Sequence, residues 1–261
     1  MNCLIETALL THGLRSIANE ELAQSWHCPD AILAWVDGGE LKIGPIGEYL
    51  PFRERSEELI RIDCDHLEEA LQTGASGALT ASGTMAVCRR LDIPMAITCG
   101  MGGIGDLRGE ELCPDLPALM NIPVALISTS PKDMLDRPST LDWLRRHGVH
   151  TAGEPCTGYL FCGEPVALEL PLSSCNNEAA VRRLTANGGL LLLNPIPEKE
   201  RVQDRSILVD AIKAGKQAEA EGHYYHPAAN GEIDRRTDGY SSRIQLESIQ
   251  QNYLLAKSIM D

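Results

Sequence analysis

Two side chains in this sequence have the chemistry for covalent catalysis, and both lie in or near apolar runs. Lys132 follows the apolar run at residues 123–127 and a short polar segment. An amine that is partly desolvated there would have a lowered pKa and could act as a nucleophile. Glu6 lies inside the apolar stretch at residues 3–10, where a carboxylate is unfavourable unless it is paired or used. A surface lysine and a salt-bridged glutamate are the competing interpretations.

A glycine-rich stretch at residues 98–109 is the third feature that could do chemistry. Its residues 100–105 spell the Gly-x-Gly-x-x-Gly fingerprint of dinucleotide-binding proteins. That site also needs a helix directly after the glycines and an acid about 20 residues further on. Here Pro114 and nearby glycine interrupt the helix, and the next strand ends in hydroxyls, proline and lysine. We therefore interpret the stretch as a turn whose backbone comes close to a ligand.

Alternating apolar segments and helical patterns predict the elements that position these residues. Strands are expected at residues 3–10, 31–36, 41–43, 94–97, 123–127 and 189–193 and from Val149, and two short β-like runs are expected within 158–170. Helices are expected at residues 16–26, 64–73, 80–91, 115–120, 140–147, 178–186, 207–221 and 244–260. Residues 222–243 are expected to form a surface excursion or a lid, with His223 and His226 on the surface. The pattern predicts a single α/β domain over residues 1–261, a mixed central sheet with helices on both faces.

Three of the expected strands end in polar turns. Ile97 leads into the glycines, Ile127 into the segment that carries Lys132, and Leu193 into residues 194–198. Ligands of α/β sheets usually bind at the carboxyl ends of the strands, so these turns are expected to meet at one pocket.

The composition limits the partners and the compartment. The 261 residues carry a formal net charge of −14, which argues against nucleic acid or an anionic membrane as the partner. An anionic small molecule needs only a few hydrogen-bond donors at its own site, so the net charge does not exclude such a ligand. The nine cysteines include no Cys-x-x-Cys pair, and neither a signal peptide nor a membrane span is visible. We expect a cytoplasmic protein with free thiols.

Together these segments resemble the pseudouridine-5′-phosphate glycosidase family, which also contains indigoidine-cluster proteins, over nearly the whole chain. Residues 6–13, 77–85 and 98–104 are similar to the family's Glu-Ser-Thr-Ile-Ile-Ser-His-Gly, Gly-Ala-Thr-Thr-Val-Ala-x-Thr-Met and Thr-Gly-Gly-Ile-Gly-Gly-Val. Residues 132–136 match its Lys-Ser-Ile-Leu-Asp, and residues 194–198 are identical to its Asn-Pro-Ile-Pro-Glu. The last two motifs, at this separation, are specific.

The resemblance implies a reversible lyase-type cleavage in which pseudouridine 5′-phosphate and water give uracil and ribose 5-phosphate. A carbon leaving group is poor, so two carboxylates alone would not suffice. An imine between a lysine and the opened sugar supplies an electron sink. By the resemblance Lys132 forms this imine, Glu6 is the general acid/base, Arg61 takes the place of a phosphate-binding lysine, and Asn194 lies at the base-binding end of the pocket.

The resemblance also implies a homotrimer and Mn²⁺, or another divalent cation, held by Glu111. Further substrate contacts are expected from Ala81, Thr84, Thr98, Cys113, Pro114 and Asp115. The chain departs from the family where Glu111 replaces an aspartate, Cys113 a serine and Gly105 a histidine. Two alternatives stay open: a C-ribosyl synthase that joins ribose 5-phosphate to another aglycone, and a non-catalytic relative that binds a sugar phosphate.

Overall fold

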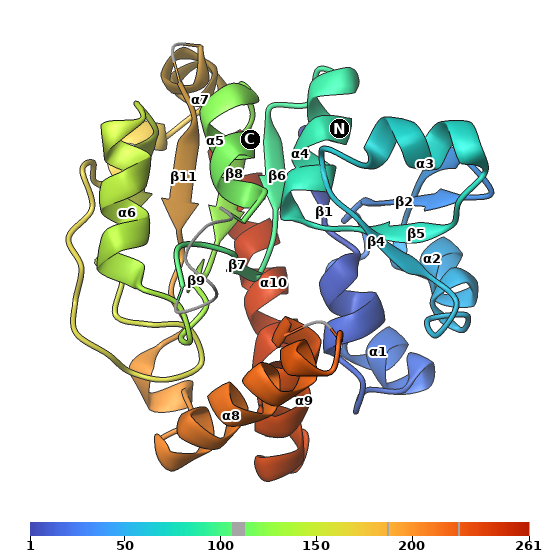
Figure 1. Ribbon diagram of the computed structural model, residues 1–261. Helices are drawn as coiled ribbons and strands as arrows, with labels where there is room; N and C mark the ends of the chain where they lie inside the picture. Colours follow the sequence, from blue (N-terminus) through green and yellow to red (C-terminus); the bar gives the residue numbers. More distant parts are fainter. Residues whose placement is uncertain (106–112, 187, 224, 261) are drawn as a thin grey trace.

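A computed structural model describes residues 1–105, 113–186, 188–223 and 225–260 and is organised around one mixed sheet (Figure 1). Its strands are β1 (Cys3–Ile5), β2 (Leu33–Asp37), β3 (Glu40–Gly44), β4 (Ile60–Ile62), β5 (Gly77–Leu79), β6 (Met95–Ile97), β8 (Ala125–Ser128), β10 (His150–Gly153) and β11 (Leu190–Leu193). The strand order is β10-β11-β8-β6-β1-β2-β5-β4, and β3 pairs with β2. Strands β10 to β2 run parallel, whereas β3 and β5 are antiparallel to β2. A separate pair joins β7 (Gly100–Met101) and β9 (Ser130–Pro131).

Helices cover both faces of this sheet. They are α1 (Asn19–Ser25), α2 (Ile46–Arg53), α3 (Leu67–Thr73), α4 (Ala81–Arg90), α5 (Asp115–Asn121), α6 (Arg137–Arg146), α7 (Glu178–Thr185), α8 (Ser206–Ala220), α9 (Tyr225–Arg236) and α10 (Tyr240–Met260). Neighbouring strand residues alternate between two cores: Ile5 packs with residues of α1, α2 and α7 to α10, and Leu4 packs with residues of α3 to α6. Each fully buried aliphatic side chain stabilises the fold by roughly 1.5–3 kcal/mol. The predicted mixed sheet between two helical layers is confirmed.

The register of the central strands lines up the residues that follow them. Ile5 of β1 pairs with Ile97 of β6, which pairs with Ile127 of β8. Glu6 and Thr98 come directly after two of these strands and so share one edge of the sheet. The helices α8 and α9 lie beyond this edge, at the bottom of Figure 1.

The predicted length of the first strand, residues 3–10, is wrong. Strand β1 ends at Ile5, and a single π-helical turn follows at Leu9–Gly13. The Thr7 hydroxyl donates to the Ala34 carbonyl at 2.8 Å and accepts the Leu79 N–H at 3.0 Å. These side-chain bonds replace strand pairing, so the chain leaves the sheet directly after Glu6.

The expected β-like runs at residues 158–170 are also not strands. Only isolated bridges occur in this segment, such as Cys156 with Val166. The half-buried carboxylate of Asp133 accepts the N–H groups of residues 159–161 at 2.8, 2.7 and 3.0 Å. Those N–H groups are therefore not free to join a ladder.

The segment 222–243 is a helix and not a surface excursion. Helix α9 fills most of it and packs against α8 and against the turn Leu9–Gly13. Its Ala229 and Ile233 are buried in the core. No helix in the described ranges is both long and apolar enough to span a membrane. All nine cysteines are free thiols, as the sequence predicts.

Candidate active site

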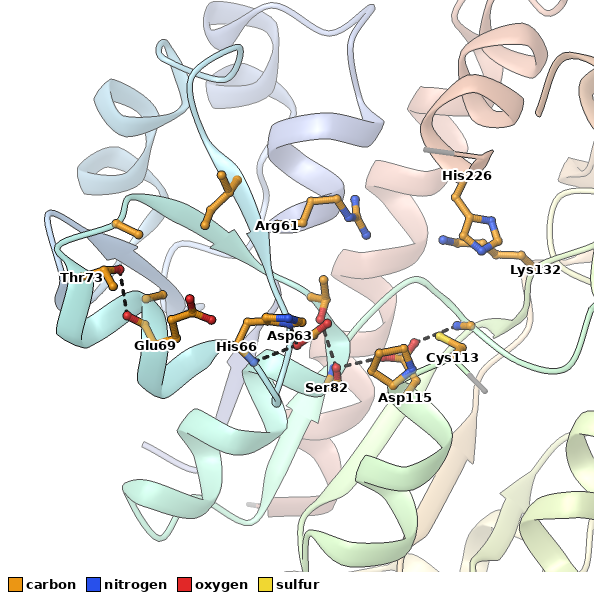
Figure 2. A pocket seen from close by; sticks show the side chains of 16 residues that line it. Arg61, Asp63, His66, Glu69, Thr73, Ser82, Cys113, Asp115, Lys132 and His226 are labelled. Carbon is orange, nitrogen blue, oxygen red and sulfur yellow. Dashed lines mark hydrogen bonds and ion pairs between the residues drawn. The ribbon is translucent and has the colours of Figure 1, made fainter. Parts of the chain in front are cut away.

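Two hollows meet at the carboxyl edge of the sheet and form one continuous site. The outer cleft has a volume of about 520 Å³, and the inner cavity has a volume of about 50 Å³. Both are lined by Arg61, Thr80, Asp115, Lys132 and His226. Figure 2 shows the Arg61 side chain pointing across the cleft towards Lys132 and His226, with Asp115 and Cys113 beside them. Glu6 lines the inner cavity.

Glu6 is a buried carboxyl group that is poised to exchange a proton near neutral pH. Its backbone N–H donates to the Ile97 carbonyl at 2.9 Å, and its side chain is only 6% exposed. Burial raises the pKa of Glu6 from an ordinary 4.5 to about 7. The Thr98 hydroxyl, which donates to Glu6 Oε1 at 2.7 Å, and the charges of Arg61 and Lys132 oppose this rise in pKa. Such a group can act as general acid and general base at pH 7.

Lys132 presents an unbonded amine to the same space. It follows β9, and its backbone N–H donates to the Met101 carbonyl at 3.1 Å. Its ammonium makes no hydrogen bond or ion pair with any described residue. Burial, followed by the positive charge of Arg61, lowers the pKa of Lys132. The neutral, nucleophilic amine is therefore more populated than at a surface lysine.

The start of helix α4 and Arg61 form a positive end of the site. Thr80 caps α4, its hydroxyl accepting the Gly83 N–H at 3.3 Å, and Ser82 lines the cleft beside it. Arg61 reaches this space from β4 and makes no hydrogen bond or ion pair with the described part of the chain. The positive end of the helix dipole and a guanidinium together suit a phosphate group.

Asp115 ties the glycine turn to α4. Its Oδ1 accepts the Ser82 N–H at 3.1 Å, and its Oδ2 accepts the Gly102 N–H at 2.8 Å. A Cβ at Gly102 would lie 2.0 Å from Cys113 Sγ, so a larger residue there would displace the Cys113 side chain. Burial raises the pKa of Cys113 to about 12, and its thiol is not a nucleophile at neutral pH.

Tyr159 closes the wall of the cavity behind Lys132. A Cβ at Gly100 would lie 2.7 Å from Tyr159 Cζ and 3.1 Å from Lys132 Cγ. The Tyr159 hydroxyl donates to Gln245 Oε1 at 2.8 Å, and its N–H is held by Asp133. Asp133, the residue after Lys132, thus helps to hold the Tyr159 ring in place beside the lysine.

The structure brings most of the residues predicted from the sequence together. Those that line the two hollows are Glu6, Arg61, Ala81, Cys113, Pro114, Asp115 and Lys132. Thr98 lies behind Glu6, and the Thr84 hydroxyl is used inside α4, where it donates to the Thr80 carbonyl at 2.8 Å. The predicted metal ligand Glu111 lies outside the described residues.

Asn194 does not reach the cavity that holds Lys132. It lines a separate groove beside α10 and donates to Asn252 Oδ1 at 3.0 Å. Asn252 in turn donates to the Thr98 carbonyl at 2.8 Å. Asn194 is therefore connected to the Thr98 side of the site through the side chain of Asn252.

Sequence reasoning missed several residues of the site. His226 lines both hollows, although the sequence predicts both His223 and His226 on the surface. Of these two histidines, His223 is exposed and His226 is half-buried. His12 and Asn230 also line the inner cavity. The signal for the two residues of α9 was their spacing of four, which places both on one face of a helix.

A divalent cation stays a prediction. In the described ranges no three His, Cys, Asp or Glu side chains lie close enough to hold a metal. Both carboxylate oxygens of Asp115 already accept backbone N–H groups. The described residues therefore do not by themselves fit a metal centre.

Comparisons with known proteins place the chain in a family. A family model described as indigoidine synthase A like protein matches residues 4–260. The pseudouridine-5′-phosphate glycosidase of Methylobacterium nodulans is 28% identical over 276 residues, covering 98% of this chain and 81% of its own. The pseudouridine-5′-phosphate glycosidase of Petrotoga mobilis is 26% identical over 277 residues, which cover 98% of this chain and 89% of the relative.

Two solved structures have the same fold. The prealnumycin C-glycosynthase AlnA in complex with ribulose 5-phosphate gives a TM-score of 0.77 at 22% identity, with 98% of this chain and 91% of that chain covered. An indigoidine synthase A-like protein from Thermotoga maritima gives 0.78 at 18% identity with the same coverage. Because the family model spans nearly the whole sequence, the chain belongs to the indigoidine synthase A-like family.

Proposed function

We propose that this protein is a C-glycosidase that cleaves the C1′–C5 bond of pseudouridine 5′-phosphate through an imine on Lys132. The observation that carries the proposal is the pairing of an unbonded, desolvated lysine with a buried glutamate whose pKa is about 7, in one cavity. A positive end formed by Arg61 and the start of α4 suits the 5′-phosphate. Curated relatives bear the name of this activity.

The proposed reaction needs one proton that moves between the two catalytic groups. Glu6 gives its proton to the ring oxygen while the Lys132 nitrogen bonds to C1′, and the sugar ring opens. The nitrogen loses a proton to Glu6. Its lone pair then forms the C=N bond as the C1′–C5 bond breaks, and Glu6 delivers the proton to C5 of the departing uracil. Water finally adds to the imine and releases ribose 5-phosphate and the free lysine.

Uracil release tests the activity. The protein is incubated with pseudouridine 5′-phosphate, with and without Mn²⁺, and free uracil is measured by chromatography. We expect release by the wild type and by Lys199→Met, a matched control at a lysine whose side chain is 83% exposed. Lys132→Met should release none. The absence of uracil from the wild type in both conditions would contradict the proposal.

Borohydride trapping tests the imine. With ribose 5-phosphate and borohydride, mass spectrometry should find one reduced sugar phosphate on the peptide that contains Lys132. Equal labelling of Lys132→Met would exclude the imine at this lysine and favour a relative that only binds the sugar phosphate.

The reverse reaction separates the remaining alternative. A C-ribosyl synthase would use the same imine but accept a different aglycone, and AlnA shows that this fold occurs in a C-glycosynthase. Formation of pseudouridine 5′-phosphate from uracil and ribose 5-phosphate supports the glycosidase. Trapping on Lys132 together with inertness towards uracil supports the synthase. The Mn²⁺ dependence and the homotrimer are part of the proposal, and chelation and size measurements test them.

A further inference from the structure

The carboxylate of Asp133 holds three consecutive backbone N–H groups of a loop that lies outside the helices and strands. Its Oδ1 accepts the Tyr159 N–H at 2.8 Å. Its Oδ2 accepts the N–H groups of Leu160 and Phe161 at 2.7 and 3.0 Å. Converging N–H groups form an anion-binding concavity, and hydrogen bonds to an ionised acceptor are strong. The anion in this concavity is a side chain of the protein itself, so the loop is tied to the residue that follows Lys132.

The loop has a conformation that this clamp requires. Gly158 has a φ of +128°, which side chains rarely adopt. A Cβ at Gly158 would collide with the Phe161 carbonyl oxygen and would lie 3.2 Å from Asp133 Oδ1. Burial raises the pKa of Asp133, whereas the three N–H groups and the charge of Arg137 oppose this rise and favour the ionised form. The conformation of the loop and the ionised carboxylate therefore support each other.

The clamp sets the position of the Tyr159 ring, which packs beside Lys132. Tyr159 is 2% exposed and lines the inner cavity. A Cβ at Gly100 would lie 2.8 Å from Tyr159 Cε1 and 3.1 Å from Lys132 Cγ, so the ring and the lysine stem meet over this glycine. The Tyr159 hydroxyl donates to Gln245 Oε1 at 2.8 Å. The ring is thus held at both ends and fills space that water would otherwise occupy beside the stem of the lysine.

Asp133 is not a counter-ion of Lys132. No hydrogen bond or ion pair joins the two side chains in the described part of the chain, although they are neighbours in the sequence. A lysine amine lies at the end of a flexible four-carbon stem, so a packed neighbour is needed to direct it. Tyr159 is such a neighbour, and Asp133 reaches the amine through it.

We propose that Asp133 is a positioning residue that holds the Tyr159 ring against the stem of Lys132, so that the amine stays desolvated and directed at C1 of the sugar. The direction towards the sugar rests on the proposed function, whereas the hold on the amine does not depend on it. Loss of the clamp frees the ring and lets water reach the amine. Water favours the ammonium form, so the pKa of Lys132, which burial lowers, should rise and the amine should lose reactivity near neutral pH.

Competitive acetylation tests the state of the amine without any substrate. Trace acetic anhydride labels neutral amines, and peptide mass spectrometry compares Lys132 with Lys199, whose side chain is 83% exposed. In the wild type we expect Lys132 to titrate at lower pH than Lys199. Asparagine has one carbonyl oxygen and cannot accept all three N–H groups. In Asp133→Asn, Lys132 should therefore titrate about one pH unit higher than in the wild type, with an about tenfold smaller neutral fraction at pH 8.

Two further variants control for the fold. Asp136→Asn is the matched control, because Asp136 caps α6 by accepting the Ser139 N–H at 2.9 Å and asparagine caps a helix equally well. This variant should label and release uracil like the wild type. Gly158→Ala distorts the clamped loop while Asp133 stays in place, and it should raise the titration of Lys132 in the same direction. It decides the matter if Asp133→Asn does not fold, and thermal melting checks the fold of each variant.

Replacements of Tyr159 test the ring itself. Tyr159→Leu removes the ring and should reproduce the titration shift of Asp133→Asn. Tyr159→Phe keeps the ring and should recover most of the shift that leucine causes. In uracil release, Asp133→Asn and Tyr159→Leu should lower kcat about tenfold and change KM less than about threefold, because the phosphate end of the site is untouched.

The outcomes separate this inference from the proposed function. If Lys132 titrates alike in the wild type and in folded Asp133→Asn, the inference is wrong even when uracil is released. If kcat falls only in proportion to the loss of folded protein while the labelling of Lys132 is unchanged, Asp133 has a structural role alone and the inference is again wrong. A shift in labelling of Lys132 without any uracil release from the wild type upholds the positioning role and contradicts the glycosidase.

Discussion

Replacing Thr98 with valine should move the pH dependence of catalysis in a calculable direction. The Thr98 hydroxyl donates to Glu6 Oε1 at 2.7 Å in a buried environment. A hydrogen bond to a charged carboxylate contributes about 1.5–3 kcal/mol, which corresponds to about one to two pH units. Valine has nearly the same shape, and the backbone bonds of Thr98 to the Ile127 and Asn252 groups do not need the hydroxyl. The pKa of Glu6 should therefore rise from about 7 to about 8–9.

The sign of the effect follows from the proton count of the site. With two protons on the Glu6–Lys132 pair the amine cannot attack, and with none no acid is present. Activity is therefore highest where the pair holds one proton, and the acid limb of the profile reports the lower pKa of the pair, to which Glu6 contributes with its pKa of about 7. Raising the pKa of Glu6 shifts this limb to higher pH.

The assay is kcat/KM for uracil release from pH 5 to pH 10 in a buffer of constant ionic strength. We expect an acid limb near pH 7 for the wild type and one to two units higher for Thr98→Val. Thr98→Ser keeps the hydroxyl and should stay within about 0.3 unit of the wild type. A folded Thr98→Val protein with an unmoved acid limb would refute the role of this hydrogen bond, and the role of Glu6 with it.

Other substitutions probe the phosphate end, the glycine turn and the buried acid. Arg61→Met should raise KM for pseudouridine 5′-phosphate by about 10- to 100-fold and change KM for unphosphorylated pseudouridine far less; equal effects on both substrates would exclude a phosphate contact. Gly100→Ala should destabilise the protein by about 1–3 kcal/mol in urea unfolding, because the new methyl group meets Tyr159 Cζ at 2.7 Å. Glu6→Gln should abolish cleavage and yet stabilise the fold at alkaline pH. Because the pKa of Glu6 is raised, the wild type loses stability as pH rises from about 4.5 to about 7, and the variant should be about 3 kcal/mol more stable above that range. A difference that does not grow with pH would show that Glu6 is not buried as an acid.

The meeting of Glu6 and Lys132 could be predicted only in part from the sequence. The position of Lys132 after an apolar strand predicts a place at the carboxyl edge of the sheet, whereas Glu6 is expected inside a strand and lies at that edge because β1 ends at Ile5. The observed register, in which Ile5, Ile97 and Ile127 are aligned, completes that prediction. The raised pKa of Glu6 could not be predicted, because it depends on burial by residues far away in the sequence.

The residues of α9 could not be predicted for a different reason. Segment 222–243 is rich in polar residues and glycine, and its helix is held by packing on α8 and on the turn Leu9–Gly13. Tertiary contacts of this kind supply most helical stability in proteins and leave little trace in the local sequence. The same holds for Asn194, whose partner Asn252 lies on α10, at the far end of the chain.

The glycine turn has the sequence pattern of a dinucleotide site, but its glycines are needed for a different physical reason. In a dinucleotide site the glycines admit a pyrophosphate, whereas here three glycines of the turn leave room for side chains of the protein itself. Gly100 leaves room for Tyr159, Gly102 for Cys113, and Gly103 for Thr140, whose Oγ1 would lie 2.6 Å from a Cβ. Thr140 also accepts the Ile104 N–H at 3.0 Å, so the turn is fixed from both sides. Because these glycines accommodate internal packing, a larger residue at Gly103 should first destabilise the turn, and binding of a dinucleotide is not expected from this motif.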